Sequence, residues 1–213
     1  MVIVEPHIMI PTTQIVKAFP CTRKAFLSNQ YKGVYGDINY ALVLGNVIHA
    51  VFQDILAQMD FRRETITKII KEAIRGQLLL LFSLGKQEKE VEDDSRRAVK
   101  NITEWLDMVL LPHKNRFGTK FTRFIAAEQE FNTTTYGIKG NIDSMICVKD
   151  KDGKEWATAL EIKTGKHHSM SYRGQVMIYS LLISERFKNA NADNILLYIM
   201  ENPVRDGFEY LKQ

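Results

Sequence analysis

Apolar side chains in the first half of the chain recur at the spacing of amphipathic helices. Three runs show this period: residues 44–56, 66–78 and 99–110. Gly85 and Pro112 end the second and third runs. We interpret the highly charged stretch 86–97 as the connection and solvated face between the last two helices. The pattern therefore predicts a helical part over about residues 40–112.

Beyond residue 120 the apolar positions change to the alternation of β-strands. Asp152 and Gly153 form a strong hairpin-turn signal between two of these strands. One face of the second strand is expected to carry Ile138, Ile142, Ile146 and Val148. The expected elements are strands at 121–131, 136–148 and 156–163, a helix capped by Ser169 or Ser171 that ends near Lys188, and a buried strand at 195–200.

The order of helices, three strands, a helix and a strand predicts an α/β fold. We expect a restriction-endonuclease-like core with a mixed central sheet flanked by helices and a helical N-terminal half. The length favours one domain over residues 1–213, with the sheet and last helix at about 121–200.

Composition and charge narrow the class of protein. The chain carries 29 Lys and Arg against 25 Asp and Glu, and 45% of its 213 residues are apolar, which excludes disordered and low-complexity chains. Its longest unbroken apolar stretch, residues 195–200, is far shorter than the roughly 20 residues that span a bilayer. The two cysteines, Cys21 and Cys147, cannot form a disulfide framework, which suits a reducing compartment. The basic balance permits a polyanionic partner.

Glu161 and Lys163 are the first candidates for chemistry. Alternation along the third strand places both on one face with Ala159, while Ile162 points to the other face. A carboxylate and an ammonium thus stand side by side at the end of a strand. A solvated ion pair on an edge strand is the alternative, and the pair alone does not decide between them.

Two earlier strands contain further acids. The hairpin turn would bring Asp143 next to Glu161. Two carboxylates in a partly buried cleft repel each other, and a hard divalent cation between them usually neutralises this repulsion. A strand-edge Asp is the alternative. Glu128 and Glu130 occupy the apparently inward face of the preceding strand. A third carboxylate near a metal and a sheet face exposed to water explain them equally well.

Two helices supply the remaining candidates. His49, one turn after Gly45, could bring a neutral imidazole to a metal, or it is a packed or surface residue. Gln175 and Tyr179 share one face of the last helix, with Arg173 nearby. An amide, a phenol and a guanidinium beside an acidic cleft suit contact with phosphates and base edges. Alternatively, Tyr179 is a core aromatic with a hydrated hydroxyl.

A weaker signal precedes the first strand, where basic and aromatic residues interleave. They are Lys114, Arg116, Phe117, Lys120, Phe121 and Arg123. Such a composition is compatible with a track for single-stranded nucleic acid and equally with a charged loop that enters a strand.

In chain order these candidates form a restrictive combination. It consists of a helical Gly-x-x-x-His ending at His49, a strand Glu, the stretches Gly137–Asp143 and Leu160–Lys166, and the Gln-x-x-x-Tyr that ends at Tyr179. The combination resembles the RecB-type branch of the PD-(D/E)xK nucleases, from about Cys21 to Met200. Four stretches are similar to eukaryotic members that join the nuclease to a replication helicase: those around Cys21, Gly137–Asp143, Leu160–Lys166 and Arg173–Leu181.

The resemblance implies a role for each matching residue. It implies metal ligands at His49, Asp143, Glu161 and the carbonyl of Ile162, a catalytic Lys163, an upstream acid at Glu128 with Glu130 as a near competitor, DNA contacts at Arg173, Gln175 and Tyr179, and an iron–sulfur ligand at Cys21. The family's [4Fe–4S] cluster takes three further cysteines, and its helicase a phosphate-binding loop, which this sequence lacks. We therefore expect a fragment of a longer chain in which the cluster is incomplete.

The function implied by the resemblance is a deoxyribonuclease that depends on Mg²⁺ or Mn²⁺. It would cleave single-stranded DNA and flaps, as endonuclease and exonuclease, in Okazaki-fragment processing and DNA end resection. The implied partners are that DNA, the single-strand DNA-binding protein of the replication machinery and the helicase domain of the same polypeptide, with no membrane. The implied location is the nucleus, with the mitochondrion as a second compartment.

Two other functions stay open at this point. One is a CRISPR-associated RecB-like exonuclease, which shares the acidic site. The other is a nucleic-acid-binding module of the same fold that no longer cleaves. The presence of Asp143, Glu161 and Lys163 together argues against the second.

Overall fold

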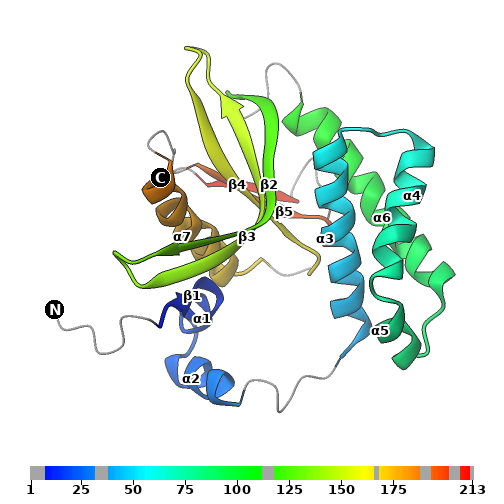
Figure 1. Ribbon diagram of the computed structural model, residues 1–213, viewed down its shortest axis with the longest axis horizontal. Helices are drawn as coiled ribbons and strands as arrows, with labels where there is room; N and C mark the ends of the chain where they lie inside the picture. Colours follow the sequence, from blue (N-terminus) through cyan, green and yellow to red (C-terminus); the bar gives the residue numbers. More distant parts are fainter. Residues whose placement is uncertain are drawn as a thin grey trace.

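The structure, a computed structural model, describes residues 8–31, 38–111, 118–165, 168–187, 193–201 and 207–211. The elements, in chain order, are β1 Ile10–Pro11, α1 Thr12–Lys17, α2 Thr22–Gln30, α3 Tyr40–Gln58, α4 Arg63–Arg75, α5 Leu78–Ser83, α6 Glu88–Trp105, the π-helical turn Leu106–Leu110, β2 Lys120–Thr133, β3 Ile138–Lys149, β4 Glu155–Lys163, α7 Met170–Arg186, β5 Asn194–Tyr198 and β6 Phe208–Leu211. A sheet thus lies among helices, most of which precede it in the chain, and the predicted α/β class is confirmed (Figure 1).

The strands form one mixed sheet of six strands. β3 pairs antiparallel with β2 along one edge. Along its other edge it pairs first with β1, in parallel, and then with β4, antiparallel. β5 lies parallel to β4, and β6 closes the sheet antiparallel to β5. β4 is therefore an interior strand, so side chains near its carboxyl end are covered by the layers on both faces.

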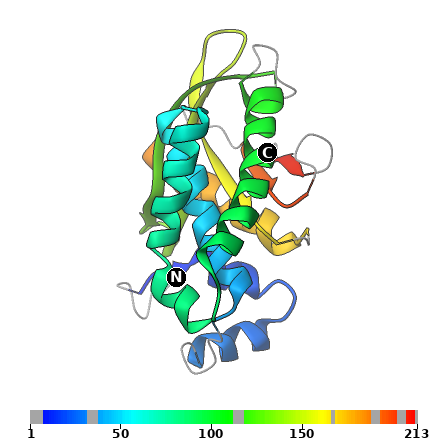
Figure 2. The same ribbon diagram turned by 90° about the vertical axis from the view of Figure 1, so that its right-hand side faces the viewer.

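Helices cover both faces of the sheet (Figures 1 and 2). α3, α4 and α6 form a helical layer on one face, whereas α7 and α1 pack on the other. Leu160 and Ile162 of β4 belong to the core under the helical layer, and Ala157 and Ala159 belong to the core under α7. The predicted alternation of this strand is therefore confirmed.

α3 attaches the helical layer to the sheet. It begins where the Asn39 side chain accepts a hydrogen bond from the backbone N–H of Leu42 at 2.9 Å. Its buried apolar side chains are Val43, Val47, Ile48, Val51, Phe52, Ile55 and Leu56. Each contributes about 1.5–3 kcal/mol when it leaves water. By length and hydropathy alone this helix would also qualify to cross a membrane, but here its apolar stripe packs against α4 and α6.

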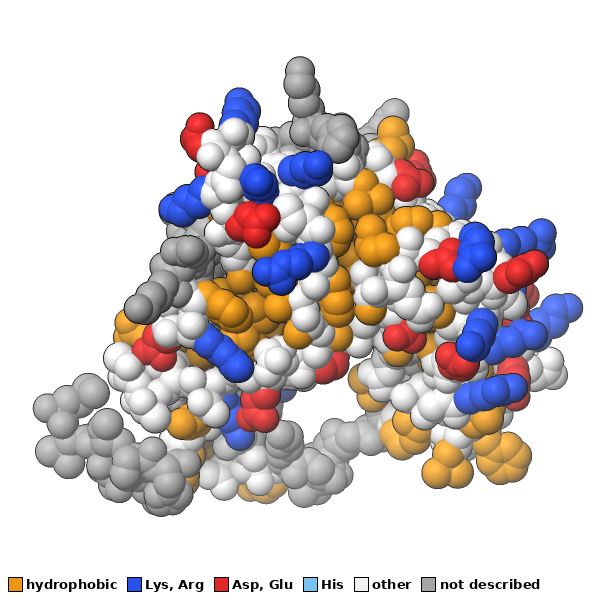
Figure 3. Space-filling view, turned by 45° about the horizontal axis from the view of Figure 1, so that its top comes forward, with side chains coloured by type: hydrophobic (Ala, Val, Ile, Leu, Met, Phe, Trp, Pro, Cys, Tyr) orange, Lys and Arg blue, Asp and Glu red, His pale blue; other side chains and the backbone are white. Residues whose placement is uncertain are grey.

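α6 differs from the prediction for the charged stretch 86–97. Most of that stretch is not a connection but the first half of α6, which begins at Glu88. The buried stripe of the helix consists of Val91, Ser95, Ala98, Val99, Ile102 and Trp105. Charged residues occupy the other face, where Arg96 pairs with Glu92 at 2.6 Å. Figure 3 shows acidic and basic side chains interleaved over the helices on the right of the view. Charge density on this face conceals the helical period in the sequence.

Three other parts of the fold differ from the sequence prediction. The second predicted helix is divided in two, because α4 ends at Arg75 and α5 begins at Leu78. The short elements β1, α1 and α2 and the last strand β6 have no counterpart in the prediction. Pro112 and Lys188, where two predicted helices end, lie outside the described residues.

The apolar residues of β3 change face part-way along the strand. Ile138 and Ile142 pack under α7, whereas Ile146 and Val148 pack against the helical layer. The prediction that these four residues share one face is therefore wrong. The change falls at Asp143, which has no partner in β2, although the register is the same on both sides of this break: Ala127 pairs with Ser144 and Gln129 with Ile142. Alternation is a property of regular pairing, and it does not extend across such a break.

Between β1 and β4 the edge of β3 has no strand neighbour over residues 140–143 in the described part of the chain. Buried backbone carbonyls need donors, and here side chains supply them. The Tyr179 hydroxyl donates to the carbonyl of Asn141 at 2.6 Å, and the Gln53 amide donates to that of Asp143 at 3.1 Å. The sheet therefore has a gap that α1, α3 and α7 surround.

Gly140 allows the helices to approach this gap closely. An added Cβ would lie 2.7 Å from Thr12 Oγ1 and 2.9 Å from Leu182 Cδ1. We expect Gly140→Ala to lower the free energy of unfolding by about 1–3 kcal/mol, as overpacking does, when measured by urea denaturation. In the control Gly76→Ala the nearest atom is 3.4 Å away, and we expect no loss or a gain of about 0.4–1 kcal/mol. Equal effects at both positions would contradict the close approach.

Candidate functional site

A cleft of about 540 Å³ opens at the gap in the sheet. Its polar lining comes from Thr12, Thr13, Glu128, Glu130, Lys139, Asn141, Asp143, Glu161, Lys163, Gln175 and Tyr179. Strands β2, β3 and β4 supply the acids, and α1 and α7 supply much of the wall. The structure therefore brings most of the sequence-predicted site residues to one place.

Glu161 is the most deeply buried acid of the site, with 1% of its surface exposed. Its Oε1 accepts hydrogen bonds from Lys163 Nζ at 2.5 Å and from Gln175 Nε2 at 2.8 Å. Its Oε2 has no hydrogen-bond partner among the described residues. Because β4 is an interior strand, the alternative of a solvated ion pair on an edge strand is wrong.

Burial and charge act together on the ionisable groups. Burial raises the pKa of Glu161, the Asp143 carboxylate raises it further, and Lys163 opposes both effects. Burial alone would lower the pKa of Lys163, but Glu161 and Asp143 raise it overall. Burial also lowers the pKa of His49, although Asp143 opposes this. The imidazole is therefore kept neutral, the form in which it binds a metal.

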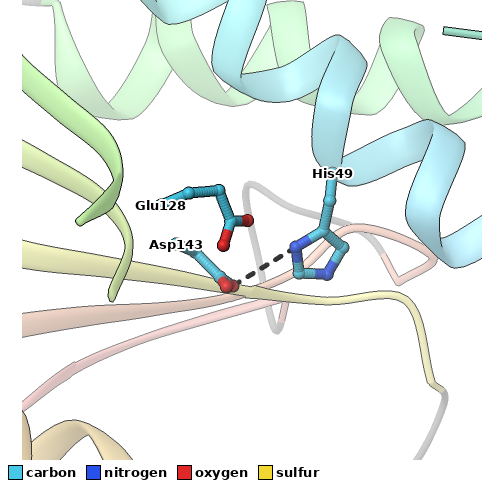
Figure 4. A group of neighbouring side chains, drawn as sticks. All are labelled: His49, Glu128 and Asp143. Atoms are coloured by element: carbon cyan, nitrogen blue, oxygen red, sulfur yellow. Dashed lines mark ion pairs between the residues drawn. The ribbon is translucent and has the colours of Figure 1, made fainter. Parts of the chain in front are cut away.

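His49, Glu128 and Asp143 point toward one another from three different elements (Figure 4). Each offers one ligand atom, and these atoms lie within 4.8 Å of one another. His49 Nδ1 is 3.4 Å from Asp143 Oδ2. Two carboxylates and a neutral imidazole are a donor set that suits a divalent cation.

The donors next to this group also fit a cation. The unpartnered Oε2 of Glu161 is a buried carboxyl oxygen that a cation could satisfy. The backbone N–H of Ile162 donates to Asp143 Oδ2 at 3.2 Å, which ties the end of β4 to the carboxylate. The four acids that line the cleft outnumber its two lysines, Lys139 and Lys163.

Glu128 has an unusual backbone conformation, with φ of 46° in the left-handed region. Its side chain is exposed, yet both carboxylate oxygens are held. Oε1 accepts from Gln53 Nε2 at 2.8 Å, and Oε2 accepts from Asn141 Nδ2. Glu130 is also exposed and lines the cleft, but it is not part of the three-residue group. The sequence pattern placed both acids on an inward-facing side of the strand, but in the structure both side chains are exposed.

The α7 residues divide into two sets. Gln175 and Tyr179 face the site, where the Gln175 amide donates to the Tyr179 hydroxyl at 2.7 Å. Burial raises the pKa of Tyr179, so the phenol keeps its proton and can donate. Arg173 lies away from the cleft lining, and its guanidinium pairs with Glu209 of β6 at 2.5 Å.

The sequence interpretation missed two residues of the site, Gln53 and Asn141. Gln53 lies one turn after His49, on the same face of α3, so the spacing of the two residues was an available signal. Asn141 precedes Asp143 by two residues on an exposed strand position, where an amide has no signal of its own. Both side chains donate hydrogen bonds to the Glu128 carboxylate. The left-handed backbone of Glu128 is not visible in the sequence.

The remaining candidates lie apart from the cleft. Cys21 is exposed, and its Sγ caps α2 by accepting from the N–H of Lys24 at 3.4 Å. Cys147 is buried, as expected of a packing residue. Of the proposed basic track, residues 114–117 lie outside the described residues.

The amino-acid sequence is similar to a known protein family and to several known proteins. The family described as "DNA replication factor Dna2" matches residues 1–148. The chain is 30% identical, over 95% of its length, to the DNA replication ATP-dependent helicase/nuclease dna2 of Schizosaccharomyces pombe. It is 24% identical to the Saccharomyces cerevisiae protein and 26% identical to the Gallus gallus protein of the same description, over 88% and 92% of its length. The chain spans only 15%, 13% and 22% of the length of these three relatives.

The left-handed backbone of Glu128 makes a prediction about stability. A side chain in this conformation costs about 1–2 kcal/mol, which Gly avoids. We expect Glu128→Gly to unfold with a free energy about 1 kcal/mol higher than Glu128→Ala, measured by urea denaturation. At the neighbouring Gln129, whose φ is not positive, the Gly variant should instead be about 0.5–1 kcal/mol less stable than the Ala variant. If the Gly and Ala variants ranked in the same order of stability at both positions, the backbone of Glu128 would not be strained.

Proposed function

Because this chain belongs to the family of the DNA replication factor Dna2, we propose that it is a nuclease domain that hydrolyses phosphodiester bonds in DNA. The names of its relatives describe helicase/nuclease enzymes of DNA replication. The acidic cleft supports the nuclease part of that description for this chain. Residues 1–213 form a single nuclease domain in this proposal.

The buried carboxylate of Glu161 is the observation that carries the proposal. Burial of a carboxylate with 1% exposure and one unpartnered oxygen is energetically unfavourable unless a bound cation compensates for it. It stands beside Lys163 and next to the group of His49, Glu128 and Asp143. A buried carboxyl with a raised pKa, beside other acids and a lysine in a cleft, is typical of sites that bind a cation and perform hydrolysis.

We assign each residue a role from its position. His49, Asp143, Glu161 and the carbonyl of Ile162 would hold a divalent cation, Mg²⁺ or Mn²⁺. Such a cation supplies Lewis acidity and neutralises charge on the phosphate. Lys163 is the catalytic lysine, which orients the attacking water and offsets negative charge as it develops.

The remaining residues keep this arrangement in place. Gln175 fixes the Glu161 carboxylate, and Tyr179 fixes both Gln175 and the backbone at Asn141. Glu128 is the upstream acid of the proposed site. It is preferred to Glu130 because its carboxylate lies in the group with His49 and Asp143.

The substrates we propose are single-stranded DNA and flaps in Okazaki-fragment processing and end resection, in the nucleus and also in the mitochondrion. Proposed partners are the single-strand DNA-binding protein of the replication machinery and the helicase part of the polypeptide. Arg173, Gln175 and Tyr179 are proposed DNA contacts. For Arg173 this requires release from Glu209. Cys21, with its exposed thiol, is proposed as one ligand of a [4Fe–4S] cluster whose other cysteines lie outside this sequence.

Removal of either central carboxylate tests the cleavage mechanism. We expect Asp143→Asn and Glu161→Gln to lower the rate of cleavage of labelled single-stranded DNA in Mg²⁺ by at least about 100-fold. Binding of the same DNA, followed by fluorescence anisotropy, should change little, because basic residues elsewhere supply most of the phosphate affinity. The control Glu104→Gln, on the exposed face of α6, should cleave like the unmodified chain. DNA binding without cleavage by the unmodified chain would indicate a non-cleaving module.

Substitution of Lys163 distinguishes a catalytic from a structural lysine. Its ammonium is largely enclosed, lies 2.5 Å from Glu161 and sits 5.0 Å from the ring centroid of Tyr172. A guanidinium keeps the charge but is broader and cannot take up a proton from water. We expect Lys163→Arg to lower the cleavage rate at saturating DNA at least about tenfold. Lys100→Arg, on the exposed face of α6, is the control. A rate within about twofold of the parent would reduce Lys163 to a structural ion pair.

A further inference from the structure

Gln53 contacts two parts of the site with one amide group. Its Nε2 lies 2.8 Å from Glu128 Oε1 and 3.1 Å from the backbone oxygen of Asp143. An amide nitrogen carries two hydrogens, so both are used on the site. The side chain is half-buried and comes from α3, one turn after His49. It therefore joins the helical layer to two strands at the point where the candidate ligands meet.

Glu128 needs this support more than an ordinary strand residue does. It is exposed, and its left-handed backbone interrupts the pairing of β2 with β3. An exposed glutamate normally samples many rotamers, and holding it in one costs side-chain entropy. Gln53 holds one of its oxygens from α3, and Asn141 holds the other from β3. The carboxylate is thus fixed from two layers of the molecule.

The second hydrogen bond of Gln53 satisfies a backbone carbonyl at the gap in the sheet. The carbonyl of Asp143 lies where no strand of the described chain pairs with this edge of β3, and the Gln53 amide donates to it. Both acceptors of Gln53 are oxygens without hydrogens of their own. A neutral double donor is therefore required at position 53, and a glutamate there would offer only acceptors and another negative charge.

We propose that Gln53 is a positioning residue, whose amide holds the Glu128 carboxylate, the upstream acid of the proposed site, beside the ligands His49 and Asp143, so that the three side chains are arranged before a cation binds. This inference rests on the proposed function of the cleft. Partners that orient metal ligands typically change metal affinity by about 10–100-fold when they are removed.

The test uses Gln53→Met, which keeps the length of the side chain but removes both donors. We expect the affinity of the chain for Mn²⁺, measured by calorimetry without DNA, to fall at least about tenfold. Gln58→Met, on an exposed position of the same helix, should bind Mn²⁺ like the unmodified chain. Gln53→Ala repeats the test with a side chain that a helix accepts well.

A double substitution separates positioning from a general effect on folding. If Gln53 acts through Glu128, then Gln53→Met in a Glu128→Ala background should change Mn²⁺ affinity less than about twofold. An equal loss in both backgrounds, with a lower unfolding temperature in the absence of metal, would overturn the inference in favour of a structural role. Unchanged Mn²⁺ affinity of Gln53→Met would overturn this inference alone. Absence of Mn²⁺ binding by the unmodified chain would instead remove the proposed function together with the inference.

Discussion

The missing strand neighbour along β3 is the constraint on which this structure depends. Successive carbonyls on that edge, at Gly137, Lys139, Asn141 and Asp143, accept from the Ile10 N–H, the Thr12 hydroxyl, the Tyr179 hydroxyl and the Gln53 amide. The first donor is a strand backbone, and the others are side chains from α1, α7 and α3. The need to satisfy buried backbone oxygens therefore draws three helices from both faces to one place. Room for a cleft is left where a strand would otherwise lie.

The same gap explains how a carboxylate can be buried at Glu161. Beyond Ser144 and Leu160, β3 and β4 no longer pair, and the Asp143 side chain replaces a backbone acceptor for the N–H of Ile162. The acids thereby approach one another in a water-poor environment, where their repulsion is strong. Such an arrangement lowers stability locally, and the Lys163 ammonium and the Gln175 amide offset only part of that cost. The proposed function accounts for this local loss of stability, because active sites commonly keep groups that a stable core would exclude.

The sequence predicted features that depend on local periodicity and missed those that depend on distant pairing. The faces of β4 were predicted correctly and the helix cap was narrowed to Ser169 or Ser171, of which Ser169 is the cap, because alternation and capping need only neighbouring residues. The change of face at Asp143 was not, because it follows from a break in pairing between two strands. Likewise, the Gln175 amide could be placed from helical spacing, whereas the pairing of Arg173 depends on β6, a strand without a sequence signal. The proposed preference for Glu128 over Glu130 required the three-dimensional arrangement, because it rests on the Glu128 carboxylate lying near His49 and Asp143.

α3 contributes both His49 and Gln53 to the candidate site, and it also carries a stripe of buried apolar side chains. Any opening between the helical layer and the sheet therefore has two simultaneous results. It takes the imidazole and the amide away from the acids, and it exposes an apolar surface that other chains can bind. We therefore expect heating to separate the candidate ligands and to promote aggregation in the same step, because both follow from loss of the contact between the two layers.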